Sequence, residues 1–141
     1  MKVFIDANII ISVFNREYPL FSYSARVLSL ADNSQFKLYT SPLCLAISYY
    51  FATKKCSAVQ ARQKIRLLAE KLFLTENKRE DVIQAASHKS ISDFEDGLQY
   101  YAALNAGCAC IVTDNVKDFY FANIEVCTAE DFLVRHVLKI K

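Results

Sequence analysis

Three acid-bearing segments of this sequence each stand beside a short apolar run. Asp6 ends the run at 3–5, residues 93–96 open an apolar helical stretch, and residues 114–118 follow the run at 110–112. A carboxylate at the buried end of a strand costs free energy unless it is paired or bound to a metal ion. Carboxylates gathered at one place make an oxygen site that suits hard cations such as Mg²⁺ or Mn²⁺. The sequence therefore predicts a metal site built by these three segments.

Each acid also has a structural explanation that the sequence leaves open. Asp6 can cap the helix that follows it, and Asp93 fits an N-cap better than it fits a ligand. Glu95 suits a solvent-facing position or a capping box. Asp96 lies one turn inside its helix, ahead of an apolar face, which favours a place in the site. Asp118 can serve only to stabilise the turn that contains it.

Short strands alternate with helices along the whole chain. Apolar and β-branched runs predict five strands, at 3–5, 36–40, 72–74, 110–112 and 124–126. Helical patterns lie at 7–14, 22–30, 41–53 and 78–88, and others begin at Ser57, at Ser92 or Asp93, and at Thr128. This alternation predicts an α/β fold of three layers, α/β/α, with a central parallel sheet in one domain spanning residues 1–141. The acids would then meet at the carboxyl ends of the strands, where open α/β sheets bind their ligands.

Helix ends and buried faces are predicted from local signals. Ser41 fits an N-cap with proline in the first turn, and Gly107 fits the C′ position of the helix before it. The last helix has acids in its first turn and bases near its end, which suits the helix dipole. These residues are Glu130, Asp131, Arg135, His136 and Lys139. The apolar residues expected to face the core on two middle helices are Val59, Ile65, Leu67 and Leu68, then Val82, Ile83 and Ala86.

Composition limits the class of protein. Of 141 residues, 53% are hydrophobic, while only two are glycine and two are proline, so a sizeable core is expected and little linker. No stretch reaches the roughly 18 apolar residues that a membrane-spanning helix needs, and no secretory signal is visible. These features predict a cytoplasmic protein with reduced thiols and no membrane segment. Five cysteines without a CxxC pair, and only His88 and His136 beside them, argue against a zinc site.

Basic residues gather in one part of a chain whose net charge is only +2. The segment 53–79 holds eight lysines and arginines but only two acids, Glu70 and Glu76. One interpretation is a solvated helix face. The other is a phosphate-attracting surface, with Arg62, Lys64 and Arg66 as its candidate residues. Two aromatic residues just before it, Tyr49 and Tyr50, fit a core or interface better than base stacking, because they lie on an apolar helix.

The acid segments resemble a known family when they are compared as whole blocks. Phe4-Ile5-Asp6-Ala7-Asn8-Ile9-Ile10, the segment 93–100 (DFEDGLQY) and the segment 112–119 (VTDNVKDF) are similar to the motif blocks of PIN domains, in the same order. The similarity is strongest to the VapC-like branch of prokaryotic toxins. It implies a metal-dependent endoribonuclease that acts as the toxin of a toxin–antitoxin pair. It also implies Mg²⁺ or Mn²⁺, an RNA substrate, a cognate antitoxin and a homodimer.

The resemblance assigns roles to particular residues. Asp6 matches the first family acid and Asp96 the third, so both are expected to bind the metal, while Asp118 with Asn115 would position the metal or its water. The supporting shell would include Asp93, Asp114, Thr113 and Ser48. The second family acid is a glutamate, but Ile47 occupies its position here, and Ser48 is the nearest polar residue.

This departure keeps other functions open. A non-catalytic PIN-like module that binds RNA or protein is the main alternative, because the site lacks one carboxylate. A receiver-like switch domain with Asp6 in an acidic pocket is a third. Against it, no aspartate terminates a central strand in mid-chain, and no lysine ends a late strand.

Overall fold

A five-stranded parallel sheet forms the centre of the protein in a computed structural model that describes residues 1–138. The strands are β1 (Lys2–Ile5), β2 (Lys37–Thr40), β3 (Phe73–Leu74), β4 (Cys110–Val112) and β5 (Glu125–Cys127). Their order in the sheet is β3-β2-β1-β4-β5. The chain therefore moves outward from β1 to β3 and then returns to the other side of β1, which makes the boundary between β1 and β4 the topological switch point. Ligands of open α/β sheets bind at the carboxyl ends of the strands beside such a point.

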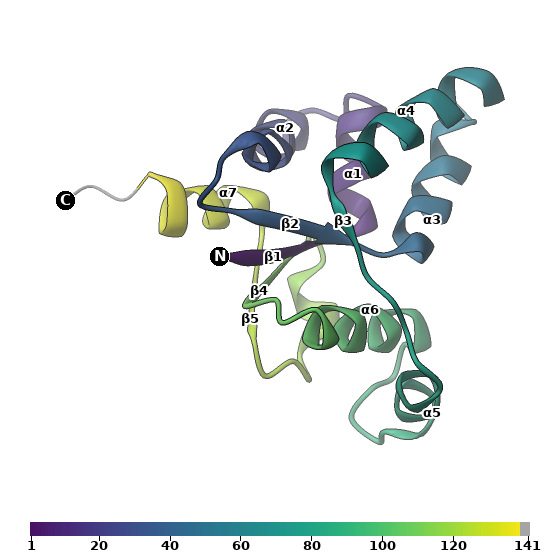
Figure 1. Ribbon diagram of the computed structural model, residues 1–141, viewed down its shortest axis with the longest axis vertical. Coiled ribbons are helices and arrows are strands. Elements are labelled where there is room, and N and C mark those ends of the chain that lie inside the picture. The colour runs from purple at the N-terminus through teal and green to yellow at the C-terminus, as the bar shows by residue number, and fades with distance from the viewer. Residues whose placement is uncertain (139–141) are drawn as a thin grey trace.

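Helices cover both faces of this sheet, as Figure 1 shows. They are α1 (Ala7–Phe14), α2 (Leu20–Ser29), α3 (Pro42–Ala52), α4 (Ala58–Lys71), α5 (Arg79–Ser87), α6 (Phe94–Asn105) and α7 (Ala129–Phe132). One core cluster joins Val3 and Ile5 to α1, α2, α4 and α7. A second cluster, on the opposite face, joins Phe4 and Ile111 to α6. Alternate residues of a strand thus pack into the clusters on opposite faces of the sheet. The predicted three-layer α/β/α architecture is confirmed.

Several predicted helix ends are confirmed by their hydrogen bonds. The Ser41 hydroxyl accepts the backbone N–H of Cys44 at 3.0 Å, and proline follows it in the first turn. Ser57 forms a capping box with Gln60. Gly107 follows α6 with a φ of +78°, the left-handed conformation that glycine adopts at little cost.

Other boundaries differ by a residue or two from those expected. Helix α2 begins at Leu20 rather than at 22, and β5 is displaced by one residue toward the C-terminus. The last helix changes after Phe132 into a π-helical turn, Leu133–Val137. Lys139, which was expected near the end of this helix, lies outside the described residues.

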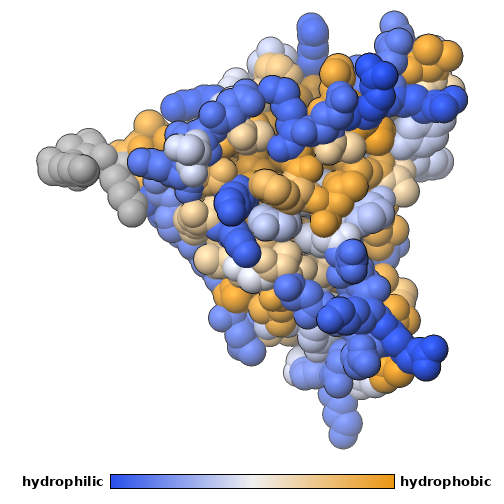
Figure 2. Space-filling view, in the orientation of Figure 1, coloured by the Kyte–Doolittle hydropathy of each residue, from blue (hydrophilic) through white to orange (hydrophobic). Residues whose placement is uncertain are grey.

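The predicted core face of α4 is confirmed for Ile65 and Leu68, which pack against the core, but is wrong for Val59 and Leu67, and the predicted core face of α5 is wrong. On α4, Val59 is 66% exposed and Leu67 is 56% exposed, and only Ala61 is buried. On α5, Ile83 is 55% exposed, and Val82 and Ala86 are exposed as well. Figure 2 accordingly shows hydrophobic residues at the surface around β3 and α4. The buried residues of α5 are Asp81 and Ala85, because α5 packs on α6 rather than on the sheet.

A glycine explains how closely α5 approaches α6. A Cβ atom on Gly97 would lie 2.9 Å from the Ile91 side chain and 3.0 Å from the Ala85 side chain, so any larger residue would push the two helices apart.

No helix within residues 1–138 is long and apolar enough to span a membrane.

Candidate active site

Asp6 stands where β1 ends and α1 begins. Its Oδ1 accepts the backbone N–H of Ala7 at 2.8 Å, so the predicted cap is present. Its Oδ2 accepts the hydroxyl of Thr113 at 2.8 Å. Burial raises the pKa of Asp6, the bonds from Thr113 and Ala7 lower it, and the charge of Asp118 raises it again, with a net upward shift. Asp6 is therefore held as a hydrogen-bond acceptor at the switch point. These hydrogen bonds offset only part of the free-energy cost of burying its charged carboxylate.

A small network of side chains ties the end of β1 to the end of β4. The side-chain Nδ2 of Asn8 donates to the Thr113 hydroxyl at 3.1 Å, and its side-chain Oδ1 accepts the backbone N–H of Asp114 at 3.0 Å. Thr113 also accepts the backbone N–H of Asn115. The importance of Asn8 was not recognised in the sequence. Its position two residues after Asp6 was the available signal, because an amide there can reach the neighbouring strand.

The acids of α6 face the same place. Asp93 accepts the backbone N–H of Asp96 at 3.0 Å, which confirms its role as the N-cap. Burial raises the pKa of Asp96 to about 7, and the negative charges of Asp93, Asp6 and Asp118 add to the shift. The charges of Asp6 and Asp118 therefore act on Asp96, although the three acids come from three separate segments.

The segment after β4 supplies the remaining predicted residues. Thr113 is fully buried, whereas Asp114, Asn115 and Asp118 are exposed. A 3₁₀ turn (Val116–Phe119) follows Asn115, and the backbone N–H of Asp118 donates to the Asn115 carbonyl at 3.0 Å. The backbone of Asp118 therefore stabilises the turn, and the negative charge of its side chain contributes to the raised pKa of Asp96.

Position 47 has the surroundings of a hydrophobic residue. Ile47 is half-buried and packs against the core cluster that includes Ala7 and Cys44. Ser48 is fully buried, and its hydroxyl donates to the Cys44 carbonyl at 2.7 Å, which commits it to its own helix rather than to the acids.

Cys44 and Gln99 are buried residues that both form a hydrogen bond with Ser41, the N-cap of α3. The Cys44 thiol lies 3.8 Å from Asp6 Oδ1 and is a residue that the sequence interpretation missed. Burial and the charge of Asp6 raise the pKa of Cys44 to about 12, so it remains a neutral thiol. Nearby, the Ser41 hydroxyl donates to the Gln99 carbonyl at 2.6 Å.

The acid group has the donor chemistry of a site for a hard divalent cation, although within residues 1–138 its three carboxylates do not all lie within 4.8 Å of one another. Within residues 1–138, no lysine, arginine or histidine forms an ion pair with Asp6, Asp96 or Asp118. Carboxylates that repel one another without a cationic partner are stabilised by a metal ion, and oxygen-only donors favour Mg²⁺ or Mn²⁺.

The basic residues lie on a different part of the surface. Arg62 and Arg66 are exposed on α4, while the Lys64 ammonium donates to the Phe14 carbonyl at 3.1 Å and is half-buried. Tyr49 is half-buried and Tyr50 is 57% exposed. A cleft of about 660 Å³ separates α3 from α4, and its lining includes Leu45, Tyr49, Val59, Arg62, Ile65 and Arg66.

Comparisons with known proteins agree on one family. The family model described as PIN domain matches residues 2–117. Ribonuclease VapC1 of Aquifex aeolicus (strain VF5) is 31% identical over 137 residues, which are 95% of this chain and 94% of that protein. The fold is similar to VapBC-1 from nontypeable Haemophilus influenzae, with a TM-score of 0.67 at 20% identity, covering 92% of this chain and 99% of that one. It is also similar to VapBC2 from Rickettsia felis bound to a DNA fragment from its promoter, with a TM-score of 0.66 at 19% identity, covering 90% and 97%.

Proposed function

The chain belongs to the PIN domain family, and we propose that it is a metal-dependent endoribonuclease, the toxin of a toxin–antitoxin pair. The observation that carries this proposal is the grouping of Asp6, Asp96 and Asp118, without a cationic partner, at the carboxyl end of the sheet. The ribonuclease named among its relatives supports the reaction class, because it aligns over almost the whole chain.

Asp6 and Asp96 would hold the Mg²⁺ or Mn²⁺ ion. A bound divalent cation lowers the pKa of a water molecule and neutralises charge on a phosphodiester. Thr113 and the N-terminus of α1 orient Asp6 as an acceptor, so its ordering does not have to occur during the reaction. Asp96 must lose its proton to bind a cation, and Asp118 with Asn115 would orient the attacking water. Asp93 and Asp114 complete the surrounding negative charge.

Partners follow from the same proposal. The RNA backbone would be held by Arg62, Lys64 and Arg66. A cognate antitoxin would bind in the cleft between α3 and α4, because this cleft combines exposed apolar side chains such as Val59 with the two arginines, which suits an amphipathic helix bearing acids. We place this activity in the cytoplasm, and self-association as a homodimer remains a prediction.

A non-catalytic binding module is the second candidate function. The observation that favours it is Ile47, whose half-buried apolar side chain stands where the family glutamate is expected. Such a module would bind RNA or a protein partner with the same surfaces, but would not hydrolyse RNA.

Nuclease assays on variants of Asp6 separate the two functions. We expect the wild-type chain to cut RNA with Mg²⁺ or Mn²⁺ and to stop when a chelator is added. Asp6→Asn keeps the helix cap but loses the charge, so it should reduce the rate by more than the roughly 10–100-fold that loss of an outer-shell metal partner costs. Asp32→Asn is the matched control, because Asp32 is an exposed acid paired with Lys71. Equal rates for wild type and Asp6→Asn would reject the metal-dependent site, and binding of RNA without cleavage would favour the module.

A further inference from the structure

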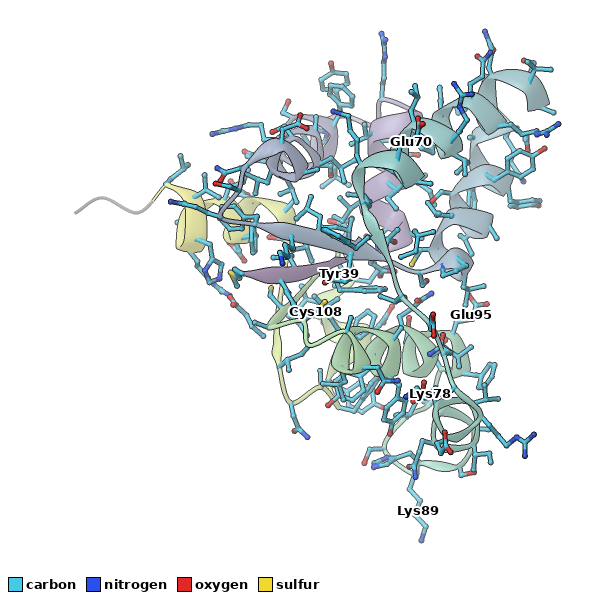
Figure 3. All side chains as sticks on the ribbon, in the orientation of Figure 1. Tyr39, Glu70, Lys78, Lys89, Glu95 and Cys108 are labelled. Atoms are coloured by element: carbon cyan, nitrogen blue, oxygen red, sulfur yellow. The ribbon has the colours of Figure 1, made fainter. Side chains whose placement is uncertain are left out.

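Two buried cysteines and a glutamate meet on β4 and β5, the last two strands of the sheet. The Sγ atoms of Cys110 and Cys127 lie 3.5 Å apart, and one carboxylate oxygen of Glu125 lies within 4.8 Å of both. Cys110 opens β4 and Glu125 opens β5, whereas Cys127 ends β5 opposite Val112, so the group extends along one face of these two strands. Figure 3 labels Glu95 at the start of α6 and Cys108 beyond the other end of this helix, and Cys108 precedes Cys110 by two residues in the sequence.

We propose that Cys110, Cys127 and Glu125 form a site for a thiophilic divalent cation of the zinc class. Thiolate and carboxylate oxygen are both zinc ligands, and two sulfurs 3.5 Å apart can each lie about 2.3 Å from one ion at an S–Zn–S angle near 100°, close to tetrahedral. Water would complete the coordination. The proposal is independent of the ribonuclease function.

The groups around this cluster balance its charge. The Arg135 guanidinium donates to Glu125 Oε2 at 3.1 Å, and His136 Nε2 lies 2.8 Å from Glu125 Oε1. Two thiolates and one carboxylate carry three negative charges, which a divalent cation and Arg135 neutralise together. Hydrogen bonds from outer residues orient carboxylate ligands in metal sites. The wide turn at 133–137 is what brings Arg135 and His136, neighbours in sequence, to the same glutamate.

A disulfide explains this geometry less well. In the register of β4 and β5, Cys110 lies opposite Glu125, and Cys127 lies opposite Val112. The two cysteines are therefore diagonal neighbours, whose Cα atoms are about 8 Å apart for strands about 4.8 Å apart with a rise of about 3.3 Å per residue, beyond the roughly 4.4–6.8 Å between the Cα atoms of most disulfides. A metal ion spans this gap without bringing the strands closer. Ions can enter beside Glu125, whose side chain is 28% exposed.

Cobalt and zinc titrations of the reduced, full-length chain test the site. Saturating Mg²⁺ is present throughout to occupy the carboxylates, because thiolates do not select Mg²⁺. We expect one Co²⁺ per chain with a thiolate-to-cobalt charge-transfer absorption, displaced by Zn²⁺. Cys110→Ser and Cys127→Ser should each abolish this absorption, and Glu125→Gln should weaken affinity by at least about tenfold. The matched control is Cys108→Ser, which removes another buried cysteine and should change nothing.

Two outcomes would overturn the proposal: no charge-transfer absorption in the wild type, or its survival in Cys110→Ser. If the serine variants do not fold, proton release from the wild type decides instead. Both thiols are buried and share an S–H···S contact, so Zn²⁺ should release about two protons per ion bound. Zinc binding without proton release would exclude thiolate ligation.

Discussion

The two ends of β4 carry opposite kinds of donor atom. At the carboxyl end, Thr113 holds Asp6 within a group of half-buried and exposed carboxylates that repel one another. At the amino end, Cys110 contacts Cys127 in the core, with Glu125 held by Arg135. Under the two proposals, the first group would bind a hard cation and the second a soft one. The three-residue strand β4 would then carry residues of both sites.

Adding the missing acid should have the largest effect on the carboxylate end. Ile47→Glu should tighten Mg²⁺ binding and raise ribonuclease activity, by about 10²–10⁴-fold where the new group acts as a general base. Isothermal titration and RNA cleavage rates measure both effects. Ile47→Gln controls for size and Ala46→Glu for charge, because Ala46 is the exposed neighbour on the same helix.

A buried charge at position 47 could also unfold the domain, because Ile47 packs against apolar residues. Circular dichroism distinguishes this case. A folded Ile47→Glu variant with neither tighter metal binding nor activity would mean that the chain acts by binding alone.

Removing the Thr113 hydroxyl should weaken Mg²⁺ binding at the carboxyl end of β4 without removing a carboxylate. Thr113→Val deletes the bond to Asp6 Oδ2, so Mg²⁺ affinity should fall by about 10–100-fold. Thr40→Val is the matched control, since Thr40 is equally buried but donates to the Ile5 carbonyl. Zinc binding at the thiol end should not change in either variant. Equal losses of Mg²⁺ affinity in both variants would show that the hydroxyl acts only through general stability.

The basic surface on α4, away from both ends of β4, should make RNA affinity depend on salt concentration. Replacing Arg62, Lys64 and Arg66 with glutamine should weaken RNA binding and reduce the slope of log affinity against log salt by about 2. Fluorescence anisotropy across a salt series provides the measurement. Glutamine replacements of Lys2, Lys37 and Lys89 remove the same charge elsewhere and should leave most of the slope. An unchanged slope in the α4 variant would reject this surface as the RNA track.

The smallest expected effect is on the free energy of unfolding, which should report the repulsion among the acids. The folded-state pKa of Asp96 is about 7, above its usual value of 3.8, so the folded protein binds the extra proton. The stability from this group is fully present below pH 3.8 and is lost as pH rises through about 7. Asp96→Asn should therefore stabilise the metal-free protein at pH 8, by about 1–2 kcal/mol after screening, and should not do so near pH 4.

Thermal unfolding with a chelator at both pH values measures this effect. Asp81→Asn is the contrasting variant, because its buried carboxylate accepts the Lys78 backbone N–H and the Asn105 amide, both at 2.7 Å. Its loss should destabilise the fold by about 1–3 kcal/mol. A large destabilisation by Asp96→Asn would assign Asp96 a structural role instead.

Local patterns in the sequence were sufficient for much of this protein. The five strands, α1 to within a residue, the caps at Ser41 and Asp93, and Gly107 after α6 were all predictable, because each depends on residues only a few positions apart. The meeting of Asp6 with the segments after β4 and at α6 was predictable as well. Parallel strands bring their carboxyl ends to one edge, so acids placed just after strands must converge.

Only the tertiary structure decided the remainder. Val59, Leu67 and Ile83 have the pattern of core residues, yet they are exposed, because α4 packs mainly on α3 and α5 packs on α6. Asn8 became a link between strands only through the pairing of β1 with β4. Cys110 and Cys127 are 17 residues apart, without the spacing of a metal motif, and the register of β4 against β5 is what places their sulfurs together. Periodicity records which residues prefer burial, but pairing and packing between distant segments determine which of them meet.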